Sequence, residues 1–284
     1  MNQKCLLVLC CVVTMFIAGC GSSSSKSGGT INGVFADAPV VGLSYSCGST
    51  TGVTQAGGAF TCPHSSTVTF TVGGATICSA PAQTFMTPVS CAQANGNPSA
   101  NASTPSVVAT AQFVISIGTP AGTTPGSLST LTITPAELQA ASGLSLNFST
   151  ATQAELQTAV TTVNPGQTLA SASTAQNELT GTVATNVAGS YSGSYSGGDT
   201  GTWTVTIDSS GNVSGSFTST SQNGQGTITG ALAYGTTFSG TAGQSGSWTG
   251  TVNTSQPPTT GKGPYLFSGT WANGSQSVNG SFTN

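Results

Sequence analysis

The clearest pattern of hydrophobic and polar positions lies in residues 187–284. Apolar residues and glycine alternate there with Ser or Thr, which is the period-2 pattern of half-buried β-strands. Short turn sequences, such as Asn223-Gly224 and Asn273-Gly274, separate the segments. Eight segments follow this pattern: Gly189–Tyr195, Gly201–Ile207, Val213–Phe217, Ile228–Leu232, Phe238–Ala242, Trp248–Val252, Phe267–Trp271 and Val278–Phe282. Because short connections join neighbouring antiparallel strands, we predict an eight-stranded meander that closes into a small barrel.

Aromatic side chains fall on the predicted inner face of this barrel, and all three tryptophans of the chain are among them. Eight-stranded barrels either pack solid or hold one small ligand. The pattern favours a packed core. The alternative is that the aromatic residues form the wall of a ligand cavity like that of lipocalin-type barrels. The candidate cavity residues are Trp203, Phe217, Trp248, Phe267 and Trp271.

Residues 30–92 carry the same alternation in shorter segments. Leu43–Cys47, Phe60–Cys62 and Val68–Val72 alternate apolar with polar residues, and Gly-rich turns separate them. We predict a small β-sandwich here and expect the first two segments to pair as a hairpin around Gly52–Gly58. The whole chain is therefore expected to be mainly β.

The period changes in residues 105–182, which follow a linker over 93–104. Val107–Ile115 carries apolar residues on one helical face, although this β-branched run is also compatible with a strand. Thr134 with Glu137 and Thr152 with Glu155 form capping boxes at the start of two further helices. With a last helix over Thr168–Leu179, the segment is predicted to be a short helical connector between the two β domains.

The chain begins with a lysine and a short apolar run that ends in small residues before Cys20. This order is typical of a secretory signal peptide. The apolar run of about 13 residues is shorter than the roughly 20 that span a bilayer. Ile17-Ala18-Gly19-Cys20 resembles the lipobox of bacterial lipoproteins. The resemblance implies a signal peptide over residues 1–19, cleavage before Cys20 and attachment to a membrane through lipid on the Cys20 sulfur.

Residues 20–29 are rich in Ser and Gly, which is typical of a flexible tether. Gly21, which follows the cysteine, resembles the pattern that sorts lipoproteins to the outer membrane. The expected location is therefore the bacterial cell envelope, with the protein lipid-anchored at the outer membrane.

Phe35–Tyr45 and Gly52–Phe60 resemble a repeated opening module of bacterial surface lipoproteins. That module resembles an immunoglobulin-like or carboxypeptidase-regulatory-like sandwich. The resemblance covers about 60 residues and implies the same β-sandwich that the alternation predicts.

Four of the eight cysteines lie beyond the signal peptide and Cys20: Cys47, Cys62, Cys78 and Cys91. Four cysteines allow three disulfide connectivities, and an exported domain favours disulfides. We expect Cys47 to pair with Cys62 and Cys78 with Cys91. The alternative is a zinc site that includes His64, but the chain has no CxxC pair. We therefore predict no metal and no cofactor.

Charged residues make up only 3% of the sequence, and no arginine is present. Nucleic-acid binding needs clustered Lys and Arg, so that class of partner is excluded. A serine triad needs a histidine, and the one histidine, His64, lies beside Pro63 in a predicted loop. Gly261-Lys262-Gly263 lacks the spacing of a phosphate-binding loop.

Paired carboxylates for glycoside hydrolysis are also missing from the predicted elements. Asp199 and Asp208 lie at opposite ends of one predicted strand, roughly 30 Å apart at about 3.3 Å per residue. Glu137 and Glu155 are explained by helix capping, and Asp37 lies in a turn. We expect no catalytic residue. The hypothesis is a non-enzymatic, membrane-anchored envelope lipoprotein with a structural or surface-interaction role, and the alternative is a small-ligand carrier that uses the barrel interior.

Overall fold

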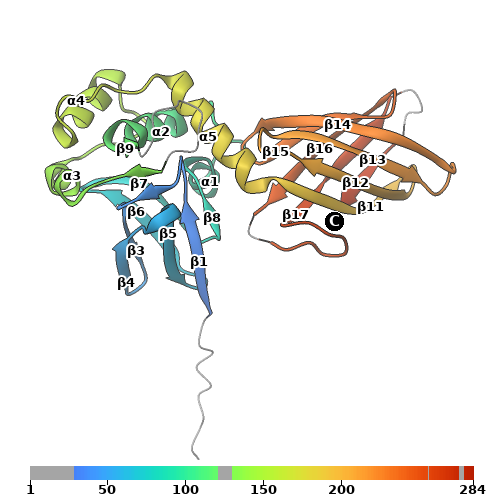
Figure 1. Cartoon of the computed structure of the whole chain (residues 1–284), viewed down its shortest axis with the longest axis horizontal. Helices are drawn as coiled ribbons and strands as arrows, with labels where there is room; N and C mark the ends of the chain where they lie inside the picture. The colour runs from blue at the N-terminus through green and yellow to red at the C-terminus, as the bar shows by residue number, and fades with distance from the viewer. Residues whose placement is uncertain (1–28, 121–129, 255, 275–277) are drawn as a thin grey trace, which may run out of the picture.

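A computed structural model describes residues 29–120, 130–254, 256–274 and 278–284. The predicted signal peptide, Cys20 and nearly all of the tether therefore lie outside the described residues. The described chain forms two globular units joined by a helix (Figure 1). It is mainly β, as the alternation of apolar and polar residues predicts.

The first unit contains a sandwich of two sheets. One sheet has the order β5-β1-β8 and the other the order β4-β3-β6-β7. Their strands are β1 (Thr30–Phe35), β3 (Ser44–Cys47), β4 (Thr50–Val53), β5 (Ala59–Pro63), β6 (Thr67–Val72), β7 (Ala75–Pro81) and β8 (Phe85–Met86), with a 3-10 turn at Ala56–Gly58. Phe35 and Phe60 of the first sheet meet Phe70 of the second, with ring centroids 4.6 and 5.1 Å apart. These aromatic contacts hold the two sheets together and confirm the predicted sandwich.

Two disulfides stabilise this unit, with the predicted pairing: Cys47 to Cys62 and Cys78 to Cys91. All four cysteines are therefore in disulfide bonds, and the zinc alternative is wrong. The expected hairpin between the first two segments is also wrong. β3 pairs with β4 and β6, whereas β5 pairs with β1, so Cys47–Cys62 crosses between the two sheets. A tight turn directly after Cys47 pairs β3 with β4 in the same sheet. The sequence prediction placed the turn later, in the Gly-rich segment Gly52–Gly58.

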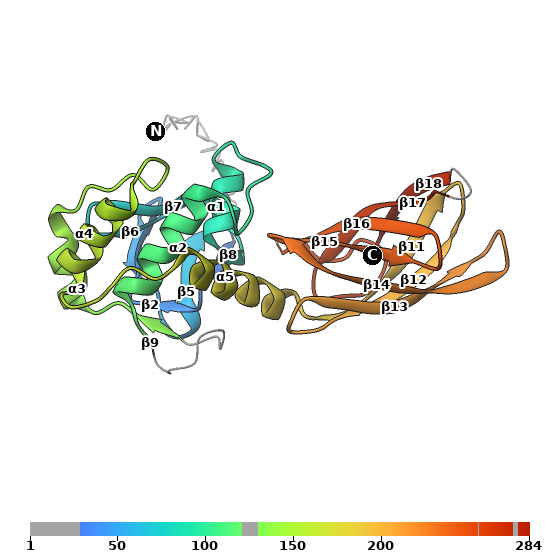
Figure 2. The ribbon, with the colours of Figure 1, turned by 90° about the horizontal axis from the view of Figure 1, so that it is seen from above.

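Helices cover the sandwich (Figures 1 and 2). They are α1 (Pro88–Ala94), α2 (Pro105–Ile117), α3 (Pro135–Ala140), α4 (Gln153–Val163) and α5 (Ala172–Val187), with a 3-10 turn at Ala141–Gly143. Both predicted capping boxes are present, because Thr134 and Thr152 each accept from the backbone N–H three residues later while the glutamate accepts in return. The ambiguous run at 107–115 is helical. α1 was not predicted, although Thr87 and Ser90 form a capping box at its start, and it crosses the predicted boundary between β domain and linker.

The helical segment does not stand apart from the β domain. Phe113 and Ile117 of α2 and Leu156 of α4 share one hydrophobic core with strand residues such as Phe70. A small three-stranded sheet adds to the same unit, with β10 (Leu131–Thr132) between β2 (Val40–Val41) and β9 (Thr119–Pro120). Residues 105–163, predicted to be a connector, therefore belong to the first unit. Only α5, which is longer than the predicted last helix, leads on to the second unit.

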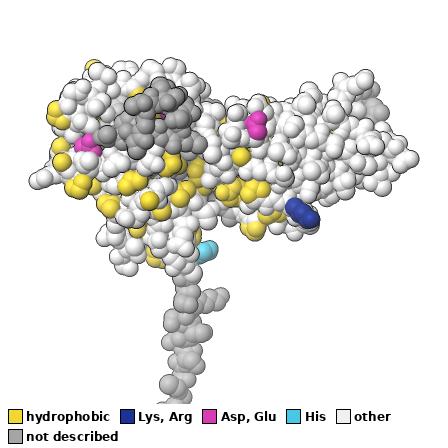
Figure 3. All heavy atoms as spheres, in the orientation of Figure 1, with side chains coloured by type: hydrophobic (Ala, Val, Ile, Leu, Met, Phe, Trp, Pro, Cys, Tyr) yellow, Lys and Arg dark blue, Asp and Glu magenta, His cyan; other side chains and the backbone are white. Residues whose placement is uncertain are grey.

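The second unit is a closed barrel of eight antiparallel strands in sequence order, as predicted. The strands are β11 (Gly189–Gly197), β12 (Gly201–Ile207), β13 (Asn212–Ser219), β14 (Gly224–Tyr234), β15 (Thr237–Ala242), β16 (Gly246–Asn253), β17 (Leu266–Asn273) and β18 (Val278–Thr283). β11 and β18 pair over Ser194–Gly197 and close the barrel. Outward positions such as Thr202, Thr204 and Thr206 are exposed. The barrel face in Figure 3 is accordingly almost free of charged and apolar side chains.

The end of the barrel that carries the β12–β13 and β14–β15 turns contacts the first unit. Leu232 of β14 packs against a small cluster of Ala36, Phe85 and Val183. Thr84 Oγ1 donates a hydrogen bond of 2.7 Å to the Thr254 carbonyl. The opposite end of the barrel points away from the first unit (Figures 1 and 2). Within the described residues, no helix combines the length and apolar character needed to cross a membrane.

Candidate ligand cavity in the barrel

The barrel interior is packed solid at the end that faces the first unit. Tyr191, Phe238 and Phe267 are almost completely buried there. Tyr191 Oη donates to the Val187 carbonyl at 2.7 Å, which ties the barrel to the end of α5. Asn284 is also fully buried, and its side chain accepts from the Phe267 N–H and donates to the carbonyls of Lys262 and Tyr265. This half of the barrel has the filled core that the sequence favoured.

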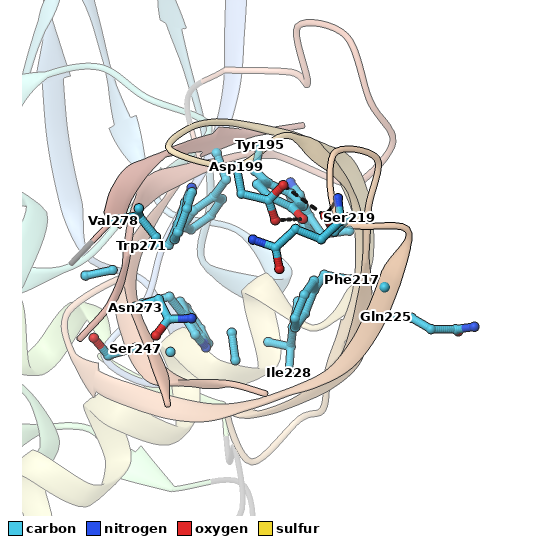
Figure 4. Close-up of a pocket in the computed structure, with 18 of the residues that line it drawn as sticks. Tyr195, Asp199, Phe217, Ser219, Gln225, Ile228, Ser247, Trp271, Asn273 and Val278 are labelled. Carbon is cyan, nitrogen blue, oxygen red and sulfur yellow. Dashed lines mark hydrogen bonds between the residues drawn. The ribbon is translucent and has the colours of Figure 1, made fainter. Parts of the chain in front are cut away.

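The other half of the barrel holds a cavity of about 240 Å³ that opens at the end remote from the first unit (Figure 4). All five candidate residues line it: Trp203, Phe217, Trp248, Phe267 and Trp271. Tyr195 and Phe282 complete an aromatic wall. The expectation of a filled core therefore holds for one half of the barrel only. The reason is that the aromatic rings pack edge to face against one another. They therefore line the outer half of the barrel and do not fill it.

Edge-to-face contacts fix the positions of these rings. Trp203 and Phe282 lie 5.5 Å apart at 79°, and Phe267 and Phe282 lie 5.4 Å apart at 84°. Such T-shaped pairs are favourable because the positive edge of one ring meets the negative face of another. The wall is consequently a mutually supported layer rather than a set of independent side chains.

Glycines on neighbouring strands make room for these rings. A Cβ atom at Gly226 would lie 2.6 Å from the Phe217 ring, and one at Gly250 would lie 2.5 Å from Phe282 and 2.7 Å from Phe267. These separations are shorter than any normal carbon–carbon contact. At these two positions glycine is therefore a packing requirement of the aromatic wall, whereas at others, such as Gly215 and Gly240, an added Cβ would meet a backbone carbonyl of the neighbouring strand.

Each indole N–H on the wall is already used in a hydrogen bond. Trp203, Trp248 and Trp271 donate to the carbonyls of Ser194, Thr229 and Ser196 at 3.1, 3.1 and 3.2 Å. An indole N–H is a donor only, so none of the three has a second hydrogen-bonding function to offer. The tryptophans consequently present apolar aromatic surface to the cavity.

Asp199 lies at the mouth, in the loop between β11 and β12 (Figure 4). Its Oδ1 accepts from the Thr200 N–H at 2.7 Å, from Ser219 Oγ at 2.9 Å and from Ser221 Oγ. Its Oδ2 accepts from Tyr195 Oη at 3.0 Å. Partial burial opposes ionisation, but the donors from Ser221, Ser219, Thr200 and Tyr195 outweigh it and lower the pKa of Asp199. The carboxylate is therefore charged at neutral pH.

Tyr195 titrates with the opposite shift. Burial, reinforced by its hydrogen bond to the Asp199 carboxylate, raises the pKa of Tyr195 to about 12. The phenol therefore stays protonated and keeps donating to Asp199 at physiological pH. The two residues act together as one element of the cavity rim.

The remaining groups with possible chemistry lie apart from one another. His64 is exposed after β5, and its Nδ1 lies 2.8 Å from Ser65 Oγ. Glu137 and Glu155 accept from their N-cap threonines, as predicted. Asp208 accepts from Ser210 and Asn212 in its turn, at the barrel end opposite Asp199. Among the described residues, no group of three or more His, Cys, Asp and Glu side chains is placed to hold a metal.

Asp37 is buried in the first unit, and neither of its carboxylate oxygens has a hydrogen-bond partner. Burial, and secondarily the charge of Glu178, raises the pKa of Asp37 well above its usual range. The turn that contains it, Ala36–Pro39, lies beside the junction of the two units. Its sequence context predicted the turn but not the burial.

Sequence reasoning missed two residues of the mouth, Asp199 and Tyr195. Tyr195 was placed on the inner face of its strand, and Asp199 was considered only as half of a catalytic pair. The available signal was that Asp199 is the carboxylate of a hairpin loop at one end of the predicted barrel. The register of β11 with β12, in which Tyr195 pairs with Gly201, turns both side chains toward the same rim.

Comparison with known proteins does not extend this assignment: no protein-family model matches the chain, and neither a curated protein nor a solved structure matches it.

Proposed function

We propose that this protein is a non-enzymatic, lipid-anchored protein of the bacterial cell envelope whose barrel carries a small, largely apolar ligand. The observation that carries the proposal is the 240 Å³ cavity with its wall of three tryptophans. Ligand sites are concave, mostly apolar and equipped with a few polar groups that fix orientation. The barrel has this arrangement, with aromatic rings inside and polar groups, among them Asp199 and Ser219, at the mouth.

The size of the cavity supports a small ligand. Pockets for drug-sized molecules have volumes of about 300–1,000 Å³, and this one, at about 240 Å³, is smaller. A purely structural barrel has no need of an open aromatic chamber, because a filled interior stabilises it through buried apolar contacts. The cavity therefore favours the carrier over a role that is only structural.

The anchor rests on Ile17-Ala18-Gly19-Cys20 and on the Ser/Gly tether that follows. The two disulfides support export but not the anchor itself, because disulfides indicate an extracellular or periplasmic location. In this arrangement lipid on Cys20 holds the first unit at the outer membrane. The barrel mouth, at the end of the molecule remote from the first unit, is open to solutes.

Tryptophan emission tests the carrier function, because all three tryptophans line the cavity. We expect a small aromatic or aliphatic ligand to shift the emission with a saturable dependence on concentration. Ala242→Phe, which fills the cavity, is expected to abolish binding. Ala231→Phe places the same ring on the exposed outer face of β14 and serves as the control. If a broad ligand panel leaves the emission of the wild type unchanged, the barrel has a structural role instead.

Membrane attachment is tested separately with Cys20→Ser. We expect this variant to lose lipid and to leave the membrane fraction. Replacement of Cys47 is expected to weaken folding and to leave attachment intact, since its disulfide joins β3 to β5. Membrane retention of Cys20→Ser would contradict the anchor.

A further inference from the structure

We propose that the barrel selects small organic amines, with the apolar body of the ligand in the aromatic chamber and its ammonium group against Asp199. This inference rests on the proposed carrier function and names its ligand class. It separates the protein from carriers of fatty acids and other anionic amphiphiles, which need a cation or free hydrogen-bond donors at the head-group position.

The first argument is the charge at the cavity. Among the described residues that line it, Asp199 carries the one formal charge. Lys262 lies at the packed end of the barrel, where its carbonyl accepts from Ser192 N–H and from the Asn284 side chain. A carboxylate at the entrance of an apolar chamber attracts cations and repels anions, and the low-dielectric wall strengthens both effects.

The second argument is the state of the donors. The three indole N–H groups donate to backbone carbonyls, and Tyr195 Oη donates to Asp199. A ligand carboxylate deep in the chamber would find none of these donors, and an unpaired buried charge is strongly unfavourable. Side-chain donors that line the cavity at its mouth, such as the Gln222 amide, lie at the same end as the Asp199 carboxylate, which repels an anion. An amine brings its own donors and does not meet this difficulty.

The third argument is the free acceptor capacity of Asp199. A carboxylate has about four lone-pair sites. Among the described residues, Oδ1 accepts from Thr200, Ser219 and Ser221, whereas Oδ2 accepts from Tyr195 alone. The Oδ2 atom therefore retains capacity for one ammonium N–H.

The Tyr195 ring, whose hydroxyl donates to Asp199, belongs to a group of aromatic rings at the cavity mouth. The Tyr195 ring lies 6.2 Å from Phe217 and 5.7 Å from Trp271, and all three line the mouth half of the cavity. Aromatic faces attract cations, and the attraction increases when the cation is desolvated. The carboxylate and the rings thus act on the same head group.

Three matched probes test the selectivity on the full-length protein: 4-phenylbutylamine, 4-phenylbutanol and 4-phenylbutanoate. All share one apolar body and differ in the charge of the head group. We expect the amine to bind about tenfold more tightly than the alcohol, which corresponds to about 1.4 kcal/mol, and the carboxylate to bind more weakly than both. Tryptophan emission and calorimetry report the binding.

Asp199→Asn is the decisive variant, because the amide carbonyl can still accept from Ser219 and Ser221 while the charge is lost. We expect amine affinity to fall to that of the alcohol and alcohol affinity to stay unchanged. Asp208→Asn removes a carboxylate at the opposite barrel end and should alter neither. If Asp199→Asn does not fold, the wild-type preference for amine over alcohol should shrink as salt screens the carboxylate.

The outcomes separate the two proposals. Binding of the alcohol with no preference for the amine, or tighter binding of the carboxylate, overturns the amine selectivity and leaves the carrier function standing. Absence of binding by all three probes, together with no response to a broader panel, overturns the carrier function itself.

Discussion

Some glycines of the barrel make room for the aromatic rings that lie over them. At Gly250 a side chain would collide with Phe282 and Phe267, whereas at Gly224 the nearest atom to an added Cβ is 4.0 Å away. Both glycines lie in strands of the same barrel, β16 and β14. Gly250 lies inside its strand and Gly224 at the start of its strand, so the pair compares a glycine under rings with one that has free space.

We predict that Gly250→Ala destabilises the barrel by about 1–3 kcal/mol, the usual effect of overpacking a core. Gly224→Ala should change stability by less than about 0.5 kcal/mol, as is usual where no special contact is disturbed. Urea unfolding followed by tryptophan emission measures both. Equal effects of the two substitutions would show that the aromatic wall does not require glycine at Gly250.

Asp37 and Asp208 are predicted to affect stability in opposite directions as pH changes. Burial raises the pKa of Asp37, so the folded state keeps a proton that the unfolded state releases at about pH 3.9. Its effect is to lower stability as pH rises above about 4. Asp37→Asn lacks this proton, and its stability relative to the wild type should increase from pH 4 to pH 7.

The pKa of Asp208 is lowered, first by the Asn212 side chain and then by backbone N–H groups. Its contribution is present above the unfolded pKa of about 3.9 and is lost as pH falls through the lower folded pKa. Asp208→Asn should therefore be less stable than the wild type at pH 7, and the difference should close in acid. Denaturant midpoints at several pH values measure both variants, and shifts of the same sign would contradict this assignment.

At the scale of elements, the Cys47–Cys62 disulfide joins two sheets rather than two strands of one hairpin. The bond has a sequence separation of 15 residues. A loop of that length contributes about 3 kcal/mol in the chain-entropy model. The contribution belongs to the first unit, since both cysteines and the sheets they join lie there.

We predict that Cys47→Ala with Cys62→Ala lowers the free energy of unfolding of the first unit by about 3 kcal/mol and leaves the barrel unchanged. The helical signal in far-UV circular dichroism follows the first unit, to which α2 and α4 belong, and tryptophan emission follows the barrel, which contains all three tryptophans. Ser46→Ala, an exposed neighbour in β3, is the control. A matching shift in the tryptophan transition would mean that the two units unfold together.

At the scale of the whole molecule, the junction of the two units includes the cluster around Leu232 and hydrogen bonds from Thr84 and Thr185. Leu232 is the barrel residue in the cluster with Ala36, Phe85 and Val183, and Thr84 with Thr254 adds one hydrogen bond. Interfaces within a chain that are small allow relative motion of the units. Leu232 is therefore an apolar barrel residue in direct contact with the first unit and α5.

We predict that Leu232→Asp leaves both units folded and loosens their junction, because a half-buried charge would replace an apolar side chain against the apolar cluster. Small-angle scattering should show a larger radius of gyration. Val53→Asp introduces the same charge at an exposed apolar residue of the edge strand β4 and should leave the radius unchanged. An unchanged radius for Leu232→Asp would show that other contacts hold the junction.

The sequence alone determined the features that depend on local periodicity. Short-range patterns of side chains predict the eight barrel strands. They also predict the capping boxes that begin α3 and α4. The aromatic residues of the cavity could be predicted for the same reason, since alternation assigns each residue of a strand to one face. The predicted disulfide pairing is confirmed, although the hairpin expected to bring Cys47 opposite Cys62 does not form.

Only the tertiary structure decided the features that depend on distant segments. The pairing of β5 with β1, the packing of α2 and α4 onto the sandwich, and the burial of Asp37 involve partners that no local pattern identifies. The same holds for the half-filled barrel, because the space left inside depends on how rings from different strands pack against one another. Asp199 became part of a candidate site only when strand register brought it to the rim with Tyr195.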